Sequence, residues 1–297
     1  MNSRKLKDYC EKIGIKTVGI AGVGPYYDLE KIILERDTKG YITGMEEPSI
    51  EKRINPRVTM ENANSIIVCA FPYYTSDYKD SNLSKYCYGK DYHLVVKSKL
   101  EEIANYIKSE VEDFEYMVFA DNGPLVDRYL AKISGIGYYG INNNIITDEF
   151  GSYVFIGYII NNFKFELDEV NIKTCKQCGV CQTACPGGAI LGNFNFNPKN
   201  CLSYITQKKE ELTSEEIEAL RRGHKVFGCD ICQEVCPHNK GIEKTTIEEF
   251  HKDIKINLDK DEIYNISNKE FKRRYNDKAF SWRGRKIIQR NMEILDK

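Results

Sequence analysis

The sequence has no long hydrophobic run and almost no net charge. Its longest apolar stretch, YVFIGYII at 153–160, is far shorter than the ~18 residues that a membrane-spanning helix needs. The first residues, MNSRKLKDYCEKIGI, mix charges of both signs and lack the apolar centre of a secretory signal. A net charge of −1 gives the whole molecule no general attraction to nucleic acid or anionic lipid. We therefore expect a cytoplasmic protein without membrane contact, whose binding surfaces are local patches.

The chain of 297 residues is long enough for two domains. Residues 1–165 alternate helical and strand patterns, which predicts a mixed α/β domain. A cysteine-rich segment covers 166–245, and within it Thr213 and Glu216 form a capping box that predicts a short helix. Residues 246–297 predict a short helical tail. The elements expected in the first domain are helices at 3–13 and 91–110 and strands at 65–74, 116–121 and 151–161.

Eleven cysteines are many for a reducing compartment, where disulfides are not the expected use. Eight of them lie between Cys175 and Cys236. Cys10 falls on the apolar stripe of the first predicted helix, and Cys69 lies inside the predicted strand SIIVCAF. Free cysteine is usually a small buried residue, so we expect these two in the core.

Two cysteine motifs have the spacing of a bacterial two-cluster ferredoxin. CKQCGVCQTACP at 175–186 is complete, whereas CDICQEVCP at 229–237 has three cysteines instead of four. In such a motif three closely spaced thiolates bind one [4Fe–4S] cluster, and the cysteine before the proline binds the other. The ligands predicted for the first cluster are Cys175, Cys178, Cys181 and Cys236, and those for the second are Cys185, Cys229 and Cys232.

Two cubane clusters need an eighth thiolate. Cys201, in NPKNCLSYITQ, is the unassigned cysteine of this segment, and we predict that it completes the second cluster. The alternative is a pair of zinc knuckles, because C-x2-C pairs also bind Zn²⁺. The two proline-terminated motifs favour [4Fe–4S] clusters, whose potential the sequence does not fix.

The order of motifs resembles that of epoxyqueuosine reductases, cobalamin-dependent iron–sulfur enzymes that complete queuosine in tRNA. The similarity covers nearly the whole chain and rests on several unrelated motifs in one order. The stretches that carry it, besides both cysteine motifs, are GYITGMEEPSIEKR (40–53), YGKDYH (88–93), DNGPLVDRYLAKISGIGYYGINNN (121–144), GSYVFIGYIIN (151–161), CLSYITQ (201–207), FGCDICQEVCP (227–237) and SWRGRKIIQRN (281–291).

The resemblance implies a fold of α+β class, in which an N-terminal cobalamin-binding α/β domain precedes the two-[4Fe–4S] ferredoxin-like domain and the basic tail. It also implies that Asp121 is the catalytic acid and that Lys209 touches tRNA. By residue type alone, Asp121 is more simply a strand-end aspartate accepting backbone hydrogen bonds. His93 is left out of the cobalt ligands. Positions that match the family's corrinoid contacts are Arg53, Ser84, Asp121, Ser203, Asp230 and Ile231.

The chain departs from the family pattern at two places. Ile141 stands where a lysine is common, and the helical-repeat module that many members carry after the R-N motif is not expected before Lys297. Residues 272–290 are basic, with Asp277 as their one acid and with Tyr275, Phe280 and Trp282 interleaved. This pattern predicts either RNA contact or a solvated basic helix. We favour RNA contact, with Arg283 and Arg285 among the residues that bind tRNA.

The predicted function is reduction of epoxyqueuosine to queuosine in tRNA by a monomer. Electrons would pass from an unidentified low-potential donor through two [4Fe–4S] clusters to cobalamin, with Asp121 as proton donor. A corrinoid-dependent reductase of a small molecule, similar to reductive dehalogenases, is one alternative. A ferredoxin-like electron carrier is another, although a carrier does not need the α/β domain.

Overall fold

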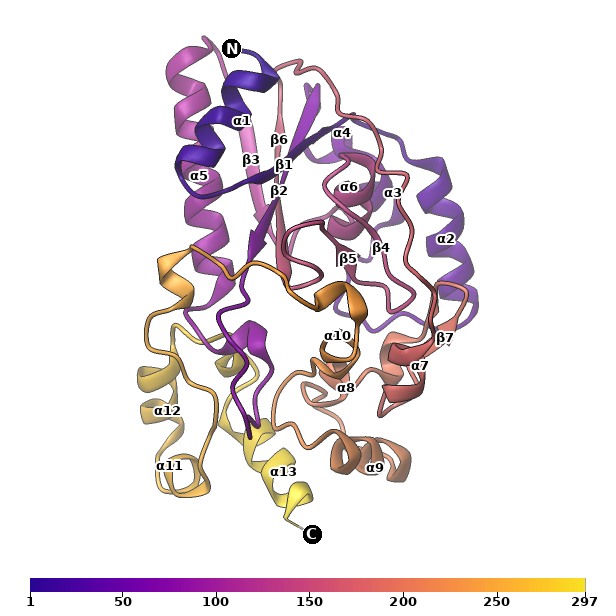
Figure 1. The fold of residues 1–297 in the computed structure, drawn as a ribbon, viewed down its shortest axis with the longest axis vertical. Helices are drawn as coiled ribbons and strands as arrows, with labels where there is room; N and C mark the ends of the chain where they lie inside the picture. Colours follow the sequence, from indigo (N-terminus) through magenta and orange to yellow (C-terminus); the bar gives the residue numbers. More distant parts are fainter. Residues whose placement is uncertain (297) are drawn as a thin grey trace. The chain divides into compact units, whose positions relative to one another are not determined.

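The computed structural model describes residues 1–296, which form two compact units (Figure 1). The first unit comprises residues 1–72, 95–140 and 144–176, and the second comprises 73–94, 141–143 and 177 onward. The boundary expected at residue 165 therefore differs from the observed grouping. Residues beyond 165 stay with the first unit because the Asp168 carboxylate accepts from the Ile20 N–H at 2.9 Å and pairs with Lys7 at 2.5 Å.

The first unit is built on a four-stranded antiparallel sheet with the order β1-β2-β6-β3. Every residue of β2 is buried, as expected of a central strand that is covered on both faces. In register, Val68 of β2 lies opposite Tyr158 of β6, which lies opposite Phe119 of β3. The strands are β1 (Thr17–Ala21), β2 (Ser65–Pro72), β3 (Tyr116–Ala120) and β6 (Val154–Asn161).

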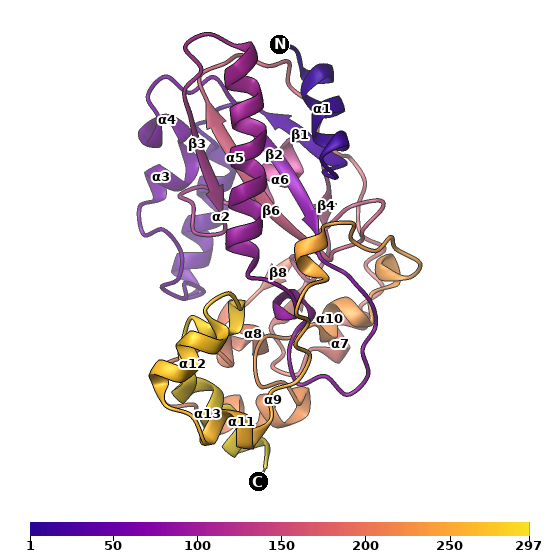
Figure 2. The same ribbon diagram turned by 90° about the vertical axis from the view of Figure 1, so that its left-hand side faces the viewer.

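Helices cover both faces of this sheet (Figures 1 and 2). α1 (Ser3–Lys12) and α5 (Tyr92–Glu110) lie on one face, and α2 (Tyr27–Thr38) and α6 (Asp127–Ile133) lie on the other. α5 packs so closely on Gly157 that a Cβ there would meet its side chains, so glycine is required at this crossing. The remaining elements of the unit are α3 (Ile50–Ile54), α4 (Pro56–Thr59), β4 (Tyr138–Tyr139) and β5 (Ile145–Ile146).

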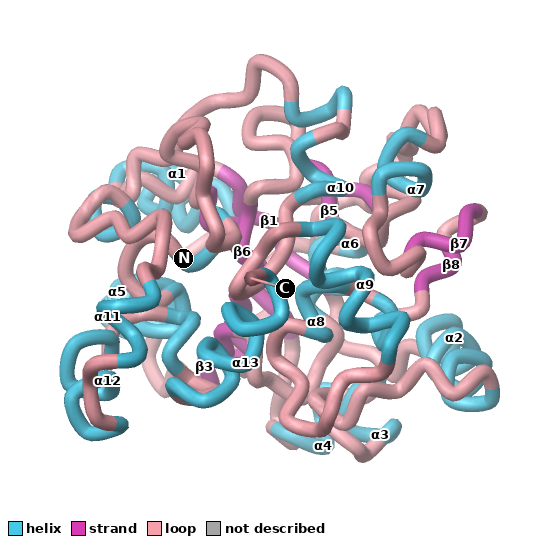
Figure 3. Tube along the Cα trace, turned by 90° about the horizontal axis from the view of Figure 1, so that it is seen from below, coloured by secondary structure: helices cyan, strands magenta, loops and turns pink. Residues whose placement is uncertain are grey.

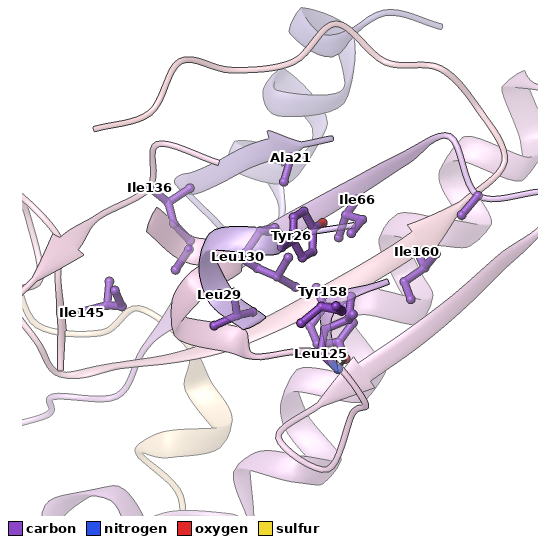
Figure 4. Packing of buried hydrophobic residues seen from close by; sticks show 14 of the residues in the cluster. Ala21, Tyr26, Leu29, Ile66, Leu125, Leu130, Ile136, Ile145, Tyr158 and Ile160 are labelled. Atoms are coloured by element: carbon purple, nitrogen blue, oxygen red, sulfur yellow. Dashed lines mark hydrogen bonds between the residues drawn. The ribbon is translucent and has the colours of Figure 1, made fainter. Parts of the chain in front are cut away.

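Tyr158 is the centre of the core on the α6 face (Figure 4). Its ring stacks on Phe119 with centroids 5.1 Å apart, and its hydroxyl accepts a hydrogen bond from the Leu125 N–H at 3.2 Å. Gly123 passes so near this hydroxyl that a side chain there would collide with it. The core thereby fixes the turn that links β3 to α6, which carries Asp121.

The second unit consists mainly of short helices and loops (Figure 3). The predicted capping box is confirmed: Thr213 accepts from the Glu216 N–H, and the Glu216 carboxylate accepts from the Thr213 N–H. Its helices are α7 (Val180–Ala184), α8 (Leu202–Ile205), α9 (Ser214–Gly223), α10 (Ile231–Glu234), α11 (Lys260–Tyr264), α12 (Asn268–Tyr275) and α13 (Arg285–Leu295). A hairpin of β7 (Ile190–Gly192) and β8 (Asn195–Phe196) completes it, with 3₁₀ turns at Lys85–Cys87, Pro198–Asn200, Pro237–Asn239, Glu248–Phe250 and Ala279–Ser281.

The predicted elements match the structure closely in the first unit. The strand expected at 65–74 ends at Pro72, and the residues after it join the second unit. Cys10 and Cys69 are fully buried, as expected. Cys87 is also fully buried, in the core of the second unit. Among residues 1–296, no helix has the length and apolar character needed to cross a membrane.

Asn291, in α13, ties together two loops of the second unit. It is fully buried, and its side-chain amide donates to the Thr206 carbonyl at 2.7 Å and the Val226 carbonyl at 2.8 Å. The Arg290 guanidinium donates to the Asn291 side-chain oxygen at 2.9 Å and to the Lys208 carbonyl at 2.6 Å. The R-N motif is therefore a structural clamp.

We predict that Asn291→Ala lowers the free energy of unfolding by about 2 kcal/mol, because two buried carbonyls lose their donor. Urea unfolding followed by circular dichroism measures the change. Asn276→Ala is the matched control, since Asn276 is exposed at the end of α12. Equal stability of the two variants would contradict the clamp.

Candidate functional site

The four cysteines predicted for the second cluster are brought together in the second unit. Cys185 ends α7, Cys201 caps α8, Cys229 precedes α10 and Cys232 lies within it. Burial raises the pKa of the Cys229 and Cys232 thiols, and negative charge on Cys201 and Cys185 raises both further. The charge of Cys201, the cysteine predicted as the eighth ligand, therefore acts on both Cys229 and Cys232.

This group of thiols fits a [4Fe–4S] cluster chemically. The four cysteines are partly buried, and thiolates that repel one another do not ionise together without a cation, a charge that iron would supply. The Ala189 N–H also donates to the Cys185 sulfur at 3.3 Å, and hydrogen bonds to sulfur are one means by which proteins tune cluster potential. Among residues 1–296, no group of three or more His, Cys, Asp or Glu side chains is spaced to hold a metal ion.

Fewer of the described contacts link the four cysteines predicted for the first cluster. Cys181 on α7 and Cys236 after α10 are buried, and these two helices pack on each other. Cys178, just before α7, is exposed. All three belong to the second unit, whereas Cys175 lies one residue before the end of the first.

A buried carboxylate organises the loop beside the second cysteine motif. Asp230 is fully buried and accepts from the Ser84 hydroxyl at 2.7 Å and from the Lys85 N–H at 2.6 Å. Burial raises its pKa, and these two hydrogen bonds oppose that rise. Lys85 pairs with Glu234 of α10 at 2.5 Å. Ser84 and Asp230, both predicted corrinoid contacts, thus bond to each other.

The other predicted corrinoid contacts in the second unit are partly exposed. Ser203 lies on α8, and its carbonyl accepts from the Gln207 amide at 2.7 Å. Ile231 begins α10 directly after Asp230. In the first unit, Arg53 lies on α3 near Glu46, and burial lowers its pKa while Glu46 opposes that effect.

Asp121 and a second aspartate lie around the turn from β3 to α6. Asp121 follows β3 with a φ of 64°, and its carbonyl accepts from the Gly123 N–H at 2.5 Å. The residue is exposed, so the first unit alone does not provide the confined site expected for it.

The second aspartate at this turn, Asp127, is half-buried and was not among the site residues predicted from the sequence. Its Oδ1 atom is out of contact with solvent and has no hydrogen-bond partner within the described part of the chain. Burial raises its pKa well above the usual value, and the charge of Asp121 adds to the rise. The repeated aspartate in DNGPLVD was the available signal.

Most basic residues of the predicted tRNA-binding tail are bound within the second unit. Arg273 and Arg274 both pair with Glu270, at 2.7 and 2.5 Å. Lys278 is buried and donates to backbone carbonyls. Arg285, expected to bind tRNA, donates to the Ile263 carbonyl at 3.1 Å at the end of α11.

The aromatic residues of the tail also divide into two kinds. Tyr275 and Phe280 are buried in the core, so the expectation that they stack on RNA bases is wrong. Trp282 is 55% exposed, with the Arg283 guanidinium 3.7 Å above its ring and its indole N–H donating to Gln207 at 2.8 Å. Lys209 is exposed, whereas Ile141, which stands where the family commonly has a lysine, is buried.

Two segments of the chain match models of known protein families. Residues 53–122 match the family described as "Epoxyqueuosine reductase QueG, DUF1730". Residues 174–239 match the "4Fe-4S double cluster binding domain", so the chain carries a domain of the kind that binds two [4Fe–4S] clusters.

Similar proteins span almost the whole chain. The epoxyqueuosine reductase of Bacillus anthracis is 36% identical over 300 residues, covering 95% of this chain and 77% of the relative. That of Bacillus subtilis is 35% identical over 312 residues, covering 98% and 78%.

Solved structures agree with this similarity. An epoxyqueuosine reductase in complex with an epoxyqueuosine-modified tRNA-Tyr stem loop superposes with a TM-score of 0.88 at 33% identity, covering 98% of this chain and 80% of that one. A Bacillus subtilis structure, with its catalytic aspartate loop swung out of the active site, gives 0.88 at 34% identity and the same coverage. A catabolic reductive dehalogenase gives 0.51 at 14% identity, covering 84% of this chain and 34% of the dehalogenase, which shows a likeness of fold alone. From its relatives and its matched domains, the chain belongs to the epoxyqueuosine reductase family.

Proposed function

We propose that this protein reduces epoxyqueuosine to queuosine in tRNA. Membership of the family carries the proposal, together with the relative that was crystallised with its modified tRNA stem loop. The chain also keeps eight cysteines in the two-cluster region, and charge coupling of Cys229 and Cys232 to Cys185 and Cys201 supports their shared role. The direct test is anaerobic incubation with precursor-bearing tRNA and a reductant, followed by nucleoside analysis. Unchanged tRNA alongside turnover of a small organic halide would instead favour the dehalogenase-like alternative.

The proposed cluster ligands follow the ferredoxin pattern. Charge coupling among the four thiols supports Cys185, Cys201, Cys229 and Cys232 as one set. Clusters held by these thiolates would supply electrons one at a time, and an external donor of low potential would reduce them again. The ligands assigned to the first cluster are Cys175, Cys178, Cys181 and Cys236.

Cobalamin is the proposed catalytic cofactor, and it supplies a low-valent cobalt centre when bound. The residues of this chain fit a corrinoid-binding role at the second unit. The Ser84–Asp230 bond fixes two backbone segments, and Ser203 and Ile231 are partly exposed beside the second cysteine set. The proposed contacts are Arg53, Ser84, Asp121, Ser203, Asp230 and Ile231, which would make residues 1–165 the main part of a cobalamin-binding domain.

Asp121 is the proposed proton donor to the oxygen that leaves the epoxide. Converting an epoxide to an alkene releases this oxygen as water and consumes two electrons and two protons. The exposed position of Asp121 in a left-handed turn lets its side chain reach a bound nucleotide. The catalytic aspartate loop of the Bacillus subtilis relative supports this assignment.

The proposed tRNA contacts form a small patch of Lys209, Trp282 and Arg283. Trp282 bonds to Gln207, which itself bonds to Ser203 on α8, so the patch adjoins a predicted corrinoid contact. An exposed indole ring stacks on an unpaired base, while the two cations neutralise phosphates. Arg285 is proposed to support this surface, because its guanidinium already caps α11.

We predict that Asp121→Asn lowers the rate of epoxyqueuosine reduction at least about 100-fold, because the direct proton donor is lost. Iron content and tRNA affinity should stay near wild type. Single-turnover nucleoside analysis measures the rate, and Asn122→Ala, at the neighbouring exposed position, is the control. A variant that reduces tRNA at the wild-type rate would remove Asp121 from the mechanism.

We predict that Cys201→Ala damages one cluster and spares the other, because the second set then has three thiolates. Iron analysis and electron paramagnetic resonance of the anaerobic protein report each cluster. Cys69→Ala serves as the control, since Cys69 is a buried core residue of the first unit. Full iron in the Cys201 variant would show that another group is the eighth ligand.

We predict that Trp282→Ala weakens binding of the tRNA stem loop about 10-fold, within the range for loss of one base-stacking contact. Trp282→Phe should retain most of the affinity because it keeps an aromatic face. Fluorescence anisotropy at fixed salt concentration measures both. If alanine and phenylalanine variants bind as tightly as wild type, the patch is not part of the RNA interface.

A further inference from the structure

The β7–β8 hairpin holds an aromatic residue in a backbone conformation that usually requires glycine. The two residues of its turn, Asn193 and Phe194, have φ values of 48° and 59°. Asn-Gly is a favoured pair in such a turn, because glycine adopts positive φ without steric cost. Phe194 takes the glycine position and is 40% exposed, so its ring is not a core residue. Strained residues of this kind cluster at functional sites, which makes the exposed ring a candidate contact for another molecule.

Two further apolar residues are exposed beside this hairpin. β7 packs on α7, and a Cβ added at Gly192 would lie 3.3 Å from the side-chain oxygen of Gln182 in α7 (Figures 1 and 3). Leu191 of β7 and Val180, which begins α7, are each 45% exposed. We call Val180, Leu191 and Phe194 the apolar patch.

The apolar patch adjoins a proposed ligand of the first cluster. Cys178 lies two residues before Val180 and is exposed, whereas Cys181, in the next turn of the same motif, is buried. Both cysteines are assigned to the first cluster. A cluster held by Cys178 therefore has a ligand at the protein surface, which makes this face the natural entry point for electrons from outside.

The charge around the apolar patch has one sign. Residues 177–209 include no Asp or Glu. Lys199 is exposed in the turn after β8, forms no ion pair within residues 1–296, and belongs to a turn whose backbone would collide with a side chain at Gly187. α10, which also packs on α7, carries Glu234 as its acid, and Glu234 pairs with Lys85 at 2.5 Å. An acidic partner is therefore complementary to this surface.

We propose that the apolar patch and Lys199 dock a small acidic carrier protein that delivers single electrons to the first cluster. This inference rests on the proposed function, which needs an external donor. Electron-transfer partners bury little surface, which suits three apolar side chains and one cation. Each encounter oxidises the carrier by one electron and reduces a cluster by one electron, so two encounters supply one reduction of the epoxide.

Phe194→Gly tests the aromatic contact without straining the hairpin, because glycine fits the φ of 59°. The melting temperature should stay the same or rise. We expect the second-order rate constant for cluster reduction by the hydroquinone of an acidic flavodoxin to fall about 10-fold, as for loss of an aromatic interface residue. Stopped-flow absorbance of the anaerobic, cluster-loaded protein measures it. Phe194→Tyr should keep most of the rate, and reduced methyl viologen should reduce wild type and the glycine variant equally fast.

Lys199→Glu tests the charge. At low salt we expect the rate constant with flavodoxin to fall about 10-fold, and the difference should largely disappear at about 0.5 M salt, where the attraction is screened. Lys269→Glu is the matched control, since Lys269 is exposed on α12, away from α7 in all three views (Figures 1 to 3). Carbodiimide coupling of oxidised flavodoxin adds a readout without electron transfer, and mass spectrometry should find its carboxylates joined to Lys199.

The outcomes separate the docking surface from the proposed function. Equal rates for the two lysine variants at low salt overturn the docking surface, as does a wild-type rate for Phe194→Gly. Cross-links that avoid Lys199 overturn it too, and so does a flavodoxin that leaves oxidised the clusters that methyl viologen reduces. Clusters that flavodoxin reduces through this surface, alongside tRNA that stays unreduced, overturn the proposed function and leave the docking surface standing.

Discussion

Charge repulsion among four partly buried thiols is the main electrostatic constraint on the second unit. Cys185, Cys201, Cys229 and Cys232 come from three separate segments, and each segment is short and has little core of its own. Burial and mutual repulsion oppose ionisation of Cys229 and Cys232, and the proposed cluster would supply the compensating charge. We therefore expect cluster binding and ordering of these loops to be linked.

Hydrogen bonds to backbone carbonyls hold these cysteine loops in place. Arg222 donates twice to the Pro186 carbonyl, next to Cys185, at 3.1 and 2.7 Å. Asn291 joins the segment after Cys201 to the one before Cys229. Arginines whose place in the sequence suggests RNA binding therefore donate hydrogen bonds to backbone carbonyls within the second unit. The surface left for nucleic acid is correspondingly small and centres on Trp282 and Arg283.

Local sequence patterns predict the helices and strands well. They do not predict which distant segments pack together into one unit. Strand β2 and helix α5 follow from apolar periodicity, and the eighth ligand, Cys201, from counting thiolates. The membership of residues 73–94 in the second unit depends on distant partners such as the Ser84–Asp230 bond, which no local pattern encodes. Likewise, Tyr275 and Trp282 have similar sequence surroundings, and only tertiary packing decides that one is buried and the other exposed.

The proposed reaction depends on an exposed acid, Asp121, and on an electron supply that needs eight sulfur ligands. The central claim is that these sulfurs hold two cubane clusters. Mössbauer spectroscopy of the anaerobic, ⁵⁷Fe-reconstituted protein, combined with iron analysis, tests it most directly. The account predicts about eight irons per chain, all with [4Fe–4S] parameters. About four irons per chain, or zinc in the cysteine sites with no cluster signal, would contradict it.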